Sequence, residues 1–490
     1  MAGKPSPRLI KKLHRLTRPL NSSSPPIVDT PELNFLKKPE PHVAKPSEFN
    51  AGKDLILELD DTQKLFSSFS TGKLIRSAIN VHVAAIEPVV DFGTWVMQSK
   101  LMDTFPVREI VLGTIRRTFF EHFCGGETAE EAKRNIEKLY DAGLRGMMVY
   151  GLEDADDNES CDKNLEMFLQ TAEASKSLPR SSMSFVIVKI TAICRVGLLE
   201  RASTLLSWEH KNPSLKLPWK QETLTLFAAN SPLYLTLNRP EPLTPQEEED
   251  FQLAQQRLQK LCQRCAELDV PLAIDAEYTS VQPAIDYLTY SSSILYNKDS
   301  KPIVYGTMQA YLKDAKERLF LACKDAEKMG VSMAYKLVRG AYMTRDLKVA
   351  SSLGCESPIH NNLQDTHRSY NDCASFMLDK IVDGSGALLL ATHNLDSAKL
   401  VASKSKDLGI GSKNENLQFA QLYAMSEGLS FSLRDAGFLV SKYMPFGPIE
   451  KIIPYLLRRA EENRGFLSSS EMDRQLMRKE LARRFLAAIS

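Results

Sequence analysis

From about residue 144 onward, the chain repeats one pattern eight times: a short apolar run rich in Val, Ile and Leu, then a longer segment of helical period. Strands that alternate with helices in this way usually lie parallel in one sheet. Eight units favour closure into a (β/α)8 barrel, with an open doubly wound sheet as the alternative. The predicted strands are 146–151, 184–190, 271–276, 302–305, 333–338, 387–391, 417–423 and 438–443.

Amphipathic segments separate these strands and predict the outer helices of an α/β fold. The clearest are 308–329, 361–381, 395–408 and 425–436, and the second unit carries an insertion around 208–244. Residues 60–143 are helical in pattern, with Thr128, Glu130 and Glu131 as a capping box. We therefore predict an α-helical arm over 51–144 and a distorted TIM-like barrel with C-terminal helices over 145–490.

The first 28 residues contain no Asp or Glu but six Lys and Arg, with Leu and Ile at helical spacing. An amphipathic, basic, acid-free start is typical of a mitochondrial transit peptide. A disordered basic tail is the alternative. Because residues up to about 50 stay rich in Pro and Lys, we interpret 1–50 as a transit peptide followed by a disordered linker.

Charge and cysteine content exclude several classes of protein. Lys and Arg number 62 against 61 Asp and Glu, which argues against a nucleic-acid partner. No uncharged apolar run approaches 18 residues, so no membrane-spanning helix is expected. The eight cysteines are scattered, which indicates reduced thiols, and the pair Cys262 and Cys265 lacks further ligands at zinc spacing. No metal site is predicted.

Polar side chains gather at or near the ends of the predicted strands, where barrel enzymes carry their chemistry. Each of them alone could be structural, but together they predict a polar, mostly cationic pocket for an anionic ligand. They are Lys189, Asp275, Glu277, Gln309, Lys336, Arg339, Tyr342, His393, Asn394, Gln421, Tyr423 and Tyr443.

The last unit adds an arginine pair on a predicted helix over 448–463, with Pro454 marking a kink. Arg458 and Arg459 could hold a small carboxylate through parallel charge-assisted hydrogen bonds, and Glu462 stands four residues after Arg458. The alternative is a solvated helix face with i,i+4 pairs. No G-x-G-x-x-G or Walker motif occurs, so a phosphate-bearing cofactor would have to be held by barrel loops.

Four segments together resemble the proline dehydrogenase family of mitochondrial FAD enzymes, most of all its plant members. They are Tyr-Lys-Leu-Val-Arg-Gly-Ala-Tyr at 335–342, Ala-Thr-His-Asn at 391–394, Lys-Tyr-Met-Pro-Phe-Gly at 442–447 and Tyr-Leu-Leu-Arg-Arg-Ala-Glu-Glu-Asn at 455–463. The resemblance runs from about residue 65 to the C-terminus.

The resemblance implies roles for individual residues. It implies that Arg458 and Arg459 bind the substrate carboxylate beside Lys189, that Tyr443 packs on the proline ring, and that Asp275 orders the polar floor. The implied flavin contacts are Gln309, Lys336, Val338, His393 and Glu462. Bacterial relatives carry Arg where this chain has Lys336, so a bidentate flavin contact is not implied there.

The implied activity is oxidation of L-proline to 1-pyrroline-5-carboxylate by hydride transfer to FAD, with electrons passed to a membrane quinone. The implied location is the matrix side of the inner mitochondrial membrane, with peripheral contact. Three alternatives remain: a hydroxyproline dehydrogenase, a Schiff-base aldolase that uses Lys189 or Lys336, and a binding module without catalysis.

Overall fold

The structure, a computed structural model, describes residues 57–232, 238–298, 301–453, 455–457 and 467–489. The predicted transit peptide and linker, residues 1–50, lie outside these ranges. The predicted domain boundaries at residues 50 and 144 stay predictions.

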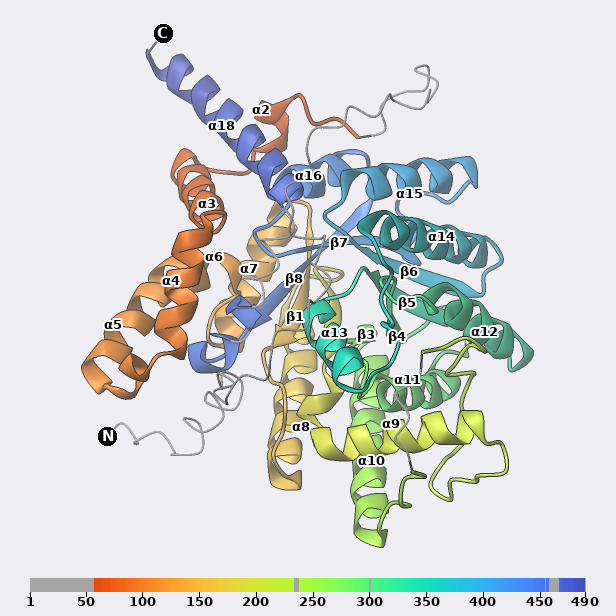
Figure 1. The fold of residues 1–490 in the computed structure, drawn as a ribbon. Coiled ribbons are helices and arrows are strands. Elements are labelled where there is room, and N and C mark those ends of the chain that lie inside the picture. The colour runs from red at the N-terminus through yellow and green to blue at the C-terminus, as the bar shows by residue number, and fades with distance from the viewer. Residues whose placement is uncertain (1–56, 233–237, 299–300, 454, 458–466, 490) are drawn as a thin grey trace.

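Eight parallel strands close into a barrel in sequence order, as Figure 1 shows. This confirms the (β/α)8 prediction, and the doubly wound alternative is wrong because β1 pairs with β8 from Arg145↔Ser441 to Tyr150↔Phe446. The strands are β1 Arg145–Tyr150, β2 Met183–Val188, β3 Leu272–Ile274, β4 Val304–Gln309, β5 Met333–Val338, β6 Gly386–Ala391, β7 Leu417–Leu422 and β8 Leu439–Phe446.

Side chains alternate between the two faces of each strand, and this alternation builds two cores. In β2, Phe185 and Ile187 point into the barrel, whereas Val186 and Val188 pack under the surrounding helices. The barrel interior is thus a packed core. The buried side chains that fill it are Met147, Val149, Phe185, Ile187, Ala273, Tyr305, Ala334, Ala387, Leu389 and Ala420.

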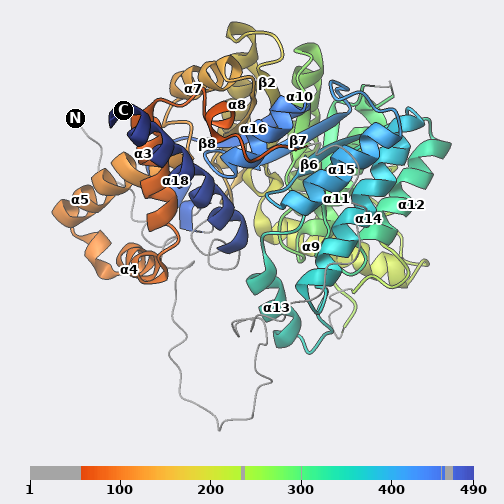
Figure 2. The same ribbon diagram turned by 90° about the horizontal axis from the view of Figure 1, so that it is seen from above.

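Helices surround the barrel and cover the outward-facing strand residues (Figures 1 and 2). Three of the predicted helices agree with the structure within two residues at each end, namely those at 361–381, 395–408 and 425–436. The helices after β1 include α8 Asn158–Glu173, α9 Val196–Lys211, α10 Pro245–Glu267, α11 Gln282–Tyr296, α12 Ala315–Lys328, α13 Met343–Ser352, α14 Leu363–Val382, α15 Leu395–Asp407, α16 Glu427–Asp435 and α18 Leu467–Ile489. Within the predicted helix 448–463, the described residues 449–453 and 455–457 are helical.

The predicted helical arm is confirmed and lies at one side of the barrel (Figures 1 and 2). It comprises α2 Thr62–Leu65, α3 Thr71–Val83, α4 Glu87–Gln98, η2 Lys100–Asp103, α5 Phe105–Ile115, η3 Arg116–Phe120, α6 Glu121–Phe123 and α7 Ala129–Asp141. The C-terminal helix α18 packs against α2 and α3. Among the described helices, none is both long enough and apolar enough to cross a bilayer.

Two strand predictions miss one end by more than two residues. Strand β4 runs to Gln309, so Met308 and Gln309 belong to the sheet and not to the predicted helix, which begins only at Ala315. Strand β8 runs past Tyr443 to Phe446 and includes Pro445, whose carbonyl accepts from the Gly125 amide at 2.7 Å. Tyr443 is therefore in the middle of its strand and not at the strand end.

All eight cysteines are free thiols, and only Cys355 is not buried. Cys262 and Cys265 lie in α10, where burial raises the pKa of the Cys262 thiol to about 12. A protonated thiol in an apolar environment packs as a small apolar side chain.

Candidate active site

A cavity of about 510 Å³ opens at the C-terminal end of the barrel strands. Seven of the ten predicted site residues line it: Lys189, Asp275, Gln309, Lys336, Val338, His393 and Tyr443. The other three, Arg458, Arg459 and Glu462, lie outside the described residues. Residues on or directly after all eight strands, from Met147 of β1 to Tyr443 of β8, line the cavity, because closure of the barrel brings its first and last strands together.

Asp275, directly after β3, forms the floor of the cavity with two partners. Its Oδ1 pairs with the Lys336 ammonium, and its Oδ2 accepts from the Tyr443 hydroxyl at 2.9 Å. The Lys336 Nζ atom also lies 5.4 Å from the centre of the Tyr443 ring. Asp275 and Lys336 are both buried, so each charge depends on the other for compensation.

Lys189, directly after β2, lines another side of the same cavity and is held there by two partners. Its Nζ atom donates to Glu153 Oε1 at 2.9 Å and to the Tyr342 hydroxyl at 3.1 Å. Sequence analysis did not single out Glu153, which follows β1. The prediction of a mostly cationic pocket thus needs qualification, because both lysines of the cavity face carboxylates.

Glu277 lies behind the cavity wall and does not line the cavity itself. Its carboxyl accepts from the Thr191 amide at 3.2 Å and from the Thr191 hydroxyl at 2.9 Å. Burial raises the pKa of Glu277 to about 7, although the nearby Lys189 opposes this shift. The Glu277 carbonyl accepts from Gln309 Nε2 at 3.1 Å and so orients a cavity side chain.

The cavity extends over the ends of β5 and β6, where Arg339 organises the loop. Its guanidinium donates to His367 Nδ1 at 3.0 Å and to the hydroxyls of Thr392 and Ser397 at 2.9 Å each. It lies 4.2 Å from the centre of the Tyr370 ring.

Glycine is required at the next position of the same loop. Gly340 has φ of +144°, and a Cβ atom there would lie 2.4 Å from the Tyr311 ring. The backbone can therefore turn closely over Tyr311 and line the cavity.

His393, after β6, accepts a hydrogen bond at Nε2 from the Leu422 amide at 3.0 Å. A neutral ring in this arrangement carries its proton on Nδ1. The neighbouring Gln421 donates to the Thr392 carbonyl at 3.2 Å and accepts from Ser430 Oγ at 2.9 Å. These bonds fix the polar side of the cavity between β6 and β7.

Several lining residues were not predicted. Thr307 was missed because β4 was ended too early, and a longer strand prediction would have included it. His367 of α14 and Met472 of α18 come from helices, whose side chains reach the cavity only through the packing of the whole fold. No sequence signal at those positions separates them from other helix residues.

The cavity combines cationic side chains, the carboxylates of Asp275 and Asp396, aromatic rings and the backbone of one glycine-containing loop. Its volume is in the range of pockets that hold cofactors and small substrates. This set of groups is able to hold a planar ring system together with an anionic group.

Comparisons with known proteins agree with this geometry. A family model described as proline dehydrogenase matches residues 132–472. The Arabidopsis thaliana protein named "Proline dehydrogenase 1, mitochondrial" is 54% identical over 455 residues, which cover 92% of this chain and 91% of the relative. "Proline dehydrogenase 2, mitochondrial" from the same plant is 50% identical over 478 residues, covering 97% and 98%.

Among solved structures, proline utilization A (PutA) from Bdellovibrio bacteriovorus, inactivated by N-propargylglycine, matches with a TM-score of 0.57. The identity is 18%, and the match covers 84% of this chain but 40% of that one, so this likeness shows the fold alone. The family model and the two plant relatives carry the assignment: the chain belongs to the proline dehydrogenase family.

Proposed function

We propose that this chain oxidises L-proline to 1-pyrroline-5-carboxylate, with FAD as cofactor and a membrane quinone as electron acceptor. The likeness to two named proline dehydrogenases over nearly the whole chain carries the proposal. Because both relatives are named mitochondrial, we further propose that residues 1–50 direct import and that the enzyme works on the matrix side of the inner membrane.

The donor set of the cavity supports a flavin cofactor. Gln309, Lys336 and His393 offer polar contacts, Val338 offers an apolar one, and we propose that Glu462 adds a further contact. The chemistry that FAD supplies when bound is acceptance of a hydride from the substrate ring carbon.

The chain's own residues would bind and orient proline. We propose that Arg458 and Arg459 hold the carboxylate, a task that suits paired guanidinium groups, with Lys189 beside them. Tyr443 would pack on the proline ring, and its bond to Asp275 holds the phenol in one orientation. With Leu422 on another side, these groups would exclude water from the reacting carbon.

Two measurements test this proposal together. The purified protein should show a visible flavin spectrum, and anaerobic addition of L-proline should bleach it. Replacing Arg458 or Arg459 by Met should lower kcat/KM for proline, which corresponds to a loss of about 2–5 kcal/mol in transition-state binding. The flavin content of the protein should stay unchanged. A colourless protein, or wild-type kcat/KM in both variants, would contradict the proposal, and borohydride trapping of a substrate would favour the aldolase.

The choice between proline and 4-hydroxyproline depends on Tyr443. A phenol held by Asp275 leaves little room for a ring hydroxyl, so we expect proline to be the better substrate. Tyr443→Ser should bring kcat/KM for 4-hydroxyproline closer to kcat/KM for proline. The expected change in the relative transition-state binding of the two substrates is about 1–3 kcal/mol. If the ratio does not move, Tyr443 does not contact the substrate ring.

A further inference from the structure

Among the described residues, about half of the exposed large apolar side chains lie on the arm. We call α4, η2 and α5, together with Ile86 just before them, the arm hairpin. In this stretch Phe92 is 64% exposed, Trp95 58%, and Phe105 and Ile110 70% each. Ile86, Val89 and Leu101 are also exposed. Such concentrated exposure marks an interaction surface.

The aromatic side chains on α4 lie together. Ile86, Val89, Phe92 and Trp95 recur at every third position, and the rings of Phe92 and Trp95 stack with centroids 5.9 Å apart. Figures 1 and 2 both place α4 and α5 at the edge of the molecule, away from the helices of the barrel. Trp and Phe in this setting suit the border between lipid headgroups and acyl chains.

The opposite side of the hairpin is tied to the cavity. Met97 and Leu112 are buried in one apolar cluster with Ile449, Ile452 and Ile453, which follow β8. Met425 and Tyr455 pack against the same cluster and also line the cavity. The hairpin is therefore continuous with the candidate active site through a single layer of side chains.

The charges of the hairpin identify the kind of partner. The hairpin itself carries two basic side chains, Lys100 and Arg108, and four acidic ones, Glu87, Asp91, Asp103 and Glu109, and it is Arg116 and Arg117, directly after it in η3, that balance the charge over residues 87–117. Arg108 pairs with Glu450 at 3.5 Å, and Arg116 pairs with Glu127 at 2.6 Å. This balance is complementary to zwitterionic headgroups, and it gives little basis for recognition of a strongly charged protein.

We propose that the arm hairpin docks on a phospholipid bilayer by inserting Phe92, Trp95 and Phe105, and so holds the cavity near the membrane. That docking serves to hold the cavity near the membrane rests on the proposed function, because a lipid-soluble electron acceptor requires the membrane to be close. Apolar insertion, rather than attraction to anionic lipid, provides the binding energy.

The test uses the flavin-loaded enzyme and vesicles of pure phosphatidylcholine in a co-sedimentation assay. The triple variant Phe92→Ser, Trp95→Ser, Phe105→Ser removes the proposed anchors. The matched control, Phe320→Ser, Leu353→Ser, Leu400→Ser, removes three exposed apolar side chains from the barrel helices and the loop after α13. We expect the vesicle partition coefficient to fall at least tenfold in the hairpin variant and to stay within twofold in the control and in 0.5 M salt.

Activity separates this proposal from the proposed function. With a soluble dye as acceptor, both variants should oxidise proline at the wild-type rate, whereas only the hairpin variant should lose activity with a quinone embedded in vesicles. Wild-type protein that does not sediment with vesicles, or a hairpin variant that binds as well as wild type, would overturn the docking proposal. So would binding that salt abolishes, or a wild-type dimer that becomes a monomer in the variant. Loss of vesicle binding in a protein that never oxidises proline would support docking and refute the proposed function.

Discussion

At the scale of single residues, the pairing of Asp275 and Lys336 decides the stability of the cavity floor. Two buried charges compensate each other there, and Tyr443 satisfies the second carboxylate oxygen. Asp275→Asn removes the counter-charge and leaves the Lys336 ammonium buried alone. We expect the free energy of unfolding to fall by about 3–5 kcal/mol, measured by urea unfolding at pH 7 without added flavin.

Two further variants separate charge from hydrogen bonding. Tyr443→Phe removes a single hydrogen bond and should cost about 1 kcal/mol. Adding Lys336→Met to Asp275→Asn removes both charges and should restore much of the lost stability. A double variant as unstable as Asp275→Asn alone would show that the ion pair is not the cause.

The buried carboxyl of Glu277 predicts how the stability of the fold depends on pH. Burial raises the pKa of its carboxyl from 4.5 to about 7, against the influence of Lys189 and with that of Glu153. Between these two values the folded state keeps a proton that the unfolded state has lost. Stability therefore falls as pH rises through this window, by as much as about 1.4 kcal/mol per pH unit.

The variant Glu277→Gln tests whether Glu277 makes stability fall as pH rises. The variant should lack the decrease in stability that Glu277 causes, so its stability relative to wild type should increase steadily from pH 5 to pH 7. Asp286 and Asp473, whose pKa values burial raises to about 6, are present in both proteins, so their contributions should cancel in the difference. A constant difference across this range would mean that Glu277 is ionised when folded.

At the scale of elements, local pattern predicted the type of each element better than its ends. The bounds of β5 agree with the prediction at both ends, because a run that is apolar except for Lys336 is bordered by Ser332 and Arg339. Strand β4 was cut short because Gly306, Thr307 and Gln309 do not resemble an apolar run, yet all are buried in the sheet. The polar side chain of Thr307 can be buried because its hydroxyl donates to the Ile274 carbonyl at 2.7 Å.

For the candidate active site too, sequence predicted one part better than another. Residues such as Lys189, Asp275 and His393 could be placed at the C-terminal mouth, because parallel strands share one carboxyl edge. Their partners could not be predicted. Tyr443 is 168 residues from Asp275 in sequence and meets it only because β8 closes on β1. Glu153 gave no signal beyond its position after a strand.

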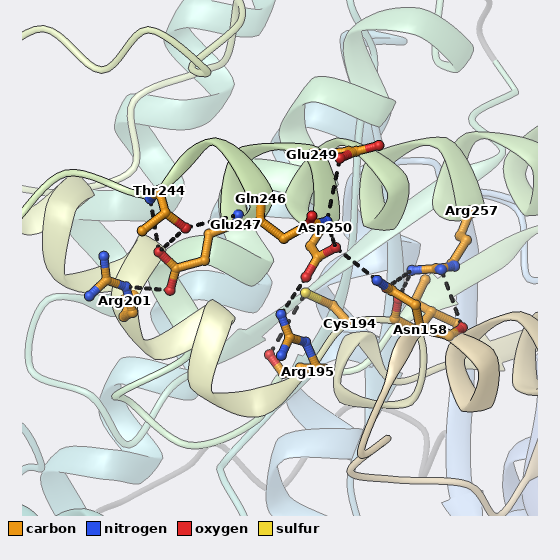
Figure 3. Close-up of polar contacts among 11 residues, drawn as sticks. Asn158, Cys194, Arg195, Arg201, Thr244, Gln246, Glu247, Glu249, Asp250 and Arg257 are labelled. Atoms are coloured by element: carbon orange, nitrogen blue, oxygen red, sulfur yellow. Dashed lines mark hydrogen bonds and ion pairs between the residues drawn. The ribbon is translucent and has the colours of Figure 1, made fainter.

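The start of α10 gives a prediction at this scale. A capping box joins Thr244 and Glu247: the Thr244 amide donates to Glu247 Oε2 at 2.9 Å, and the Glu247 amide donates to Thr244 Oγ1 at 3.3 Å. Figure 3 shows this pair and the neighbouring bond from Asn158 to Asp250. Thr244→Ala should lower the free energy of unfolding by about 1 kcal/mol.

Urea unfolding checks this prediction through a lower midpoint at an unchanged m-value. Thr244→Ser keeps the hydroxyl and should retain most of the stability. If the serine variant loses as much as the alanine variant, the effect comes from the methyl group of Thr244 and not from the cap.

At the scale of the whole molecule, the C-terminal helix binds the beginning of the described chain. Arg484 of α18 donates to the carbonyls of Phe69 at 2.8 Å and Phe66 at 2.9 Å. Its orientation depends on Glu480, which accepts from Arg484 at 2.7 Å and from the Thr62 hydroxyl at 3.2 Å. One buried carboxylate thus joins segments more than 400 residues apart in sequence.

Glu480→Gln should loosen this junction without altering the barrel. Hydrogen bonds from Arg483 and Arg484 lower the pKa of Glu480 from 4.5 to about 2, so its contribution is present above about pH 4.5 and is lost as pH falls toward 2. At pH 7 we expect faster amide hydrogen exchange in α2 and α18 and unchanged exchange in the eight strands, because local opening follows local contacts. At pH 2 the variant and wild type should exchange alike. Glu471→Gln, an exposed change on the same helix, is the control. Unchanged exchange of α2 in Glu480→Gln would show that the Glu480 carboxylate does not hold α2 and α18 together.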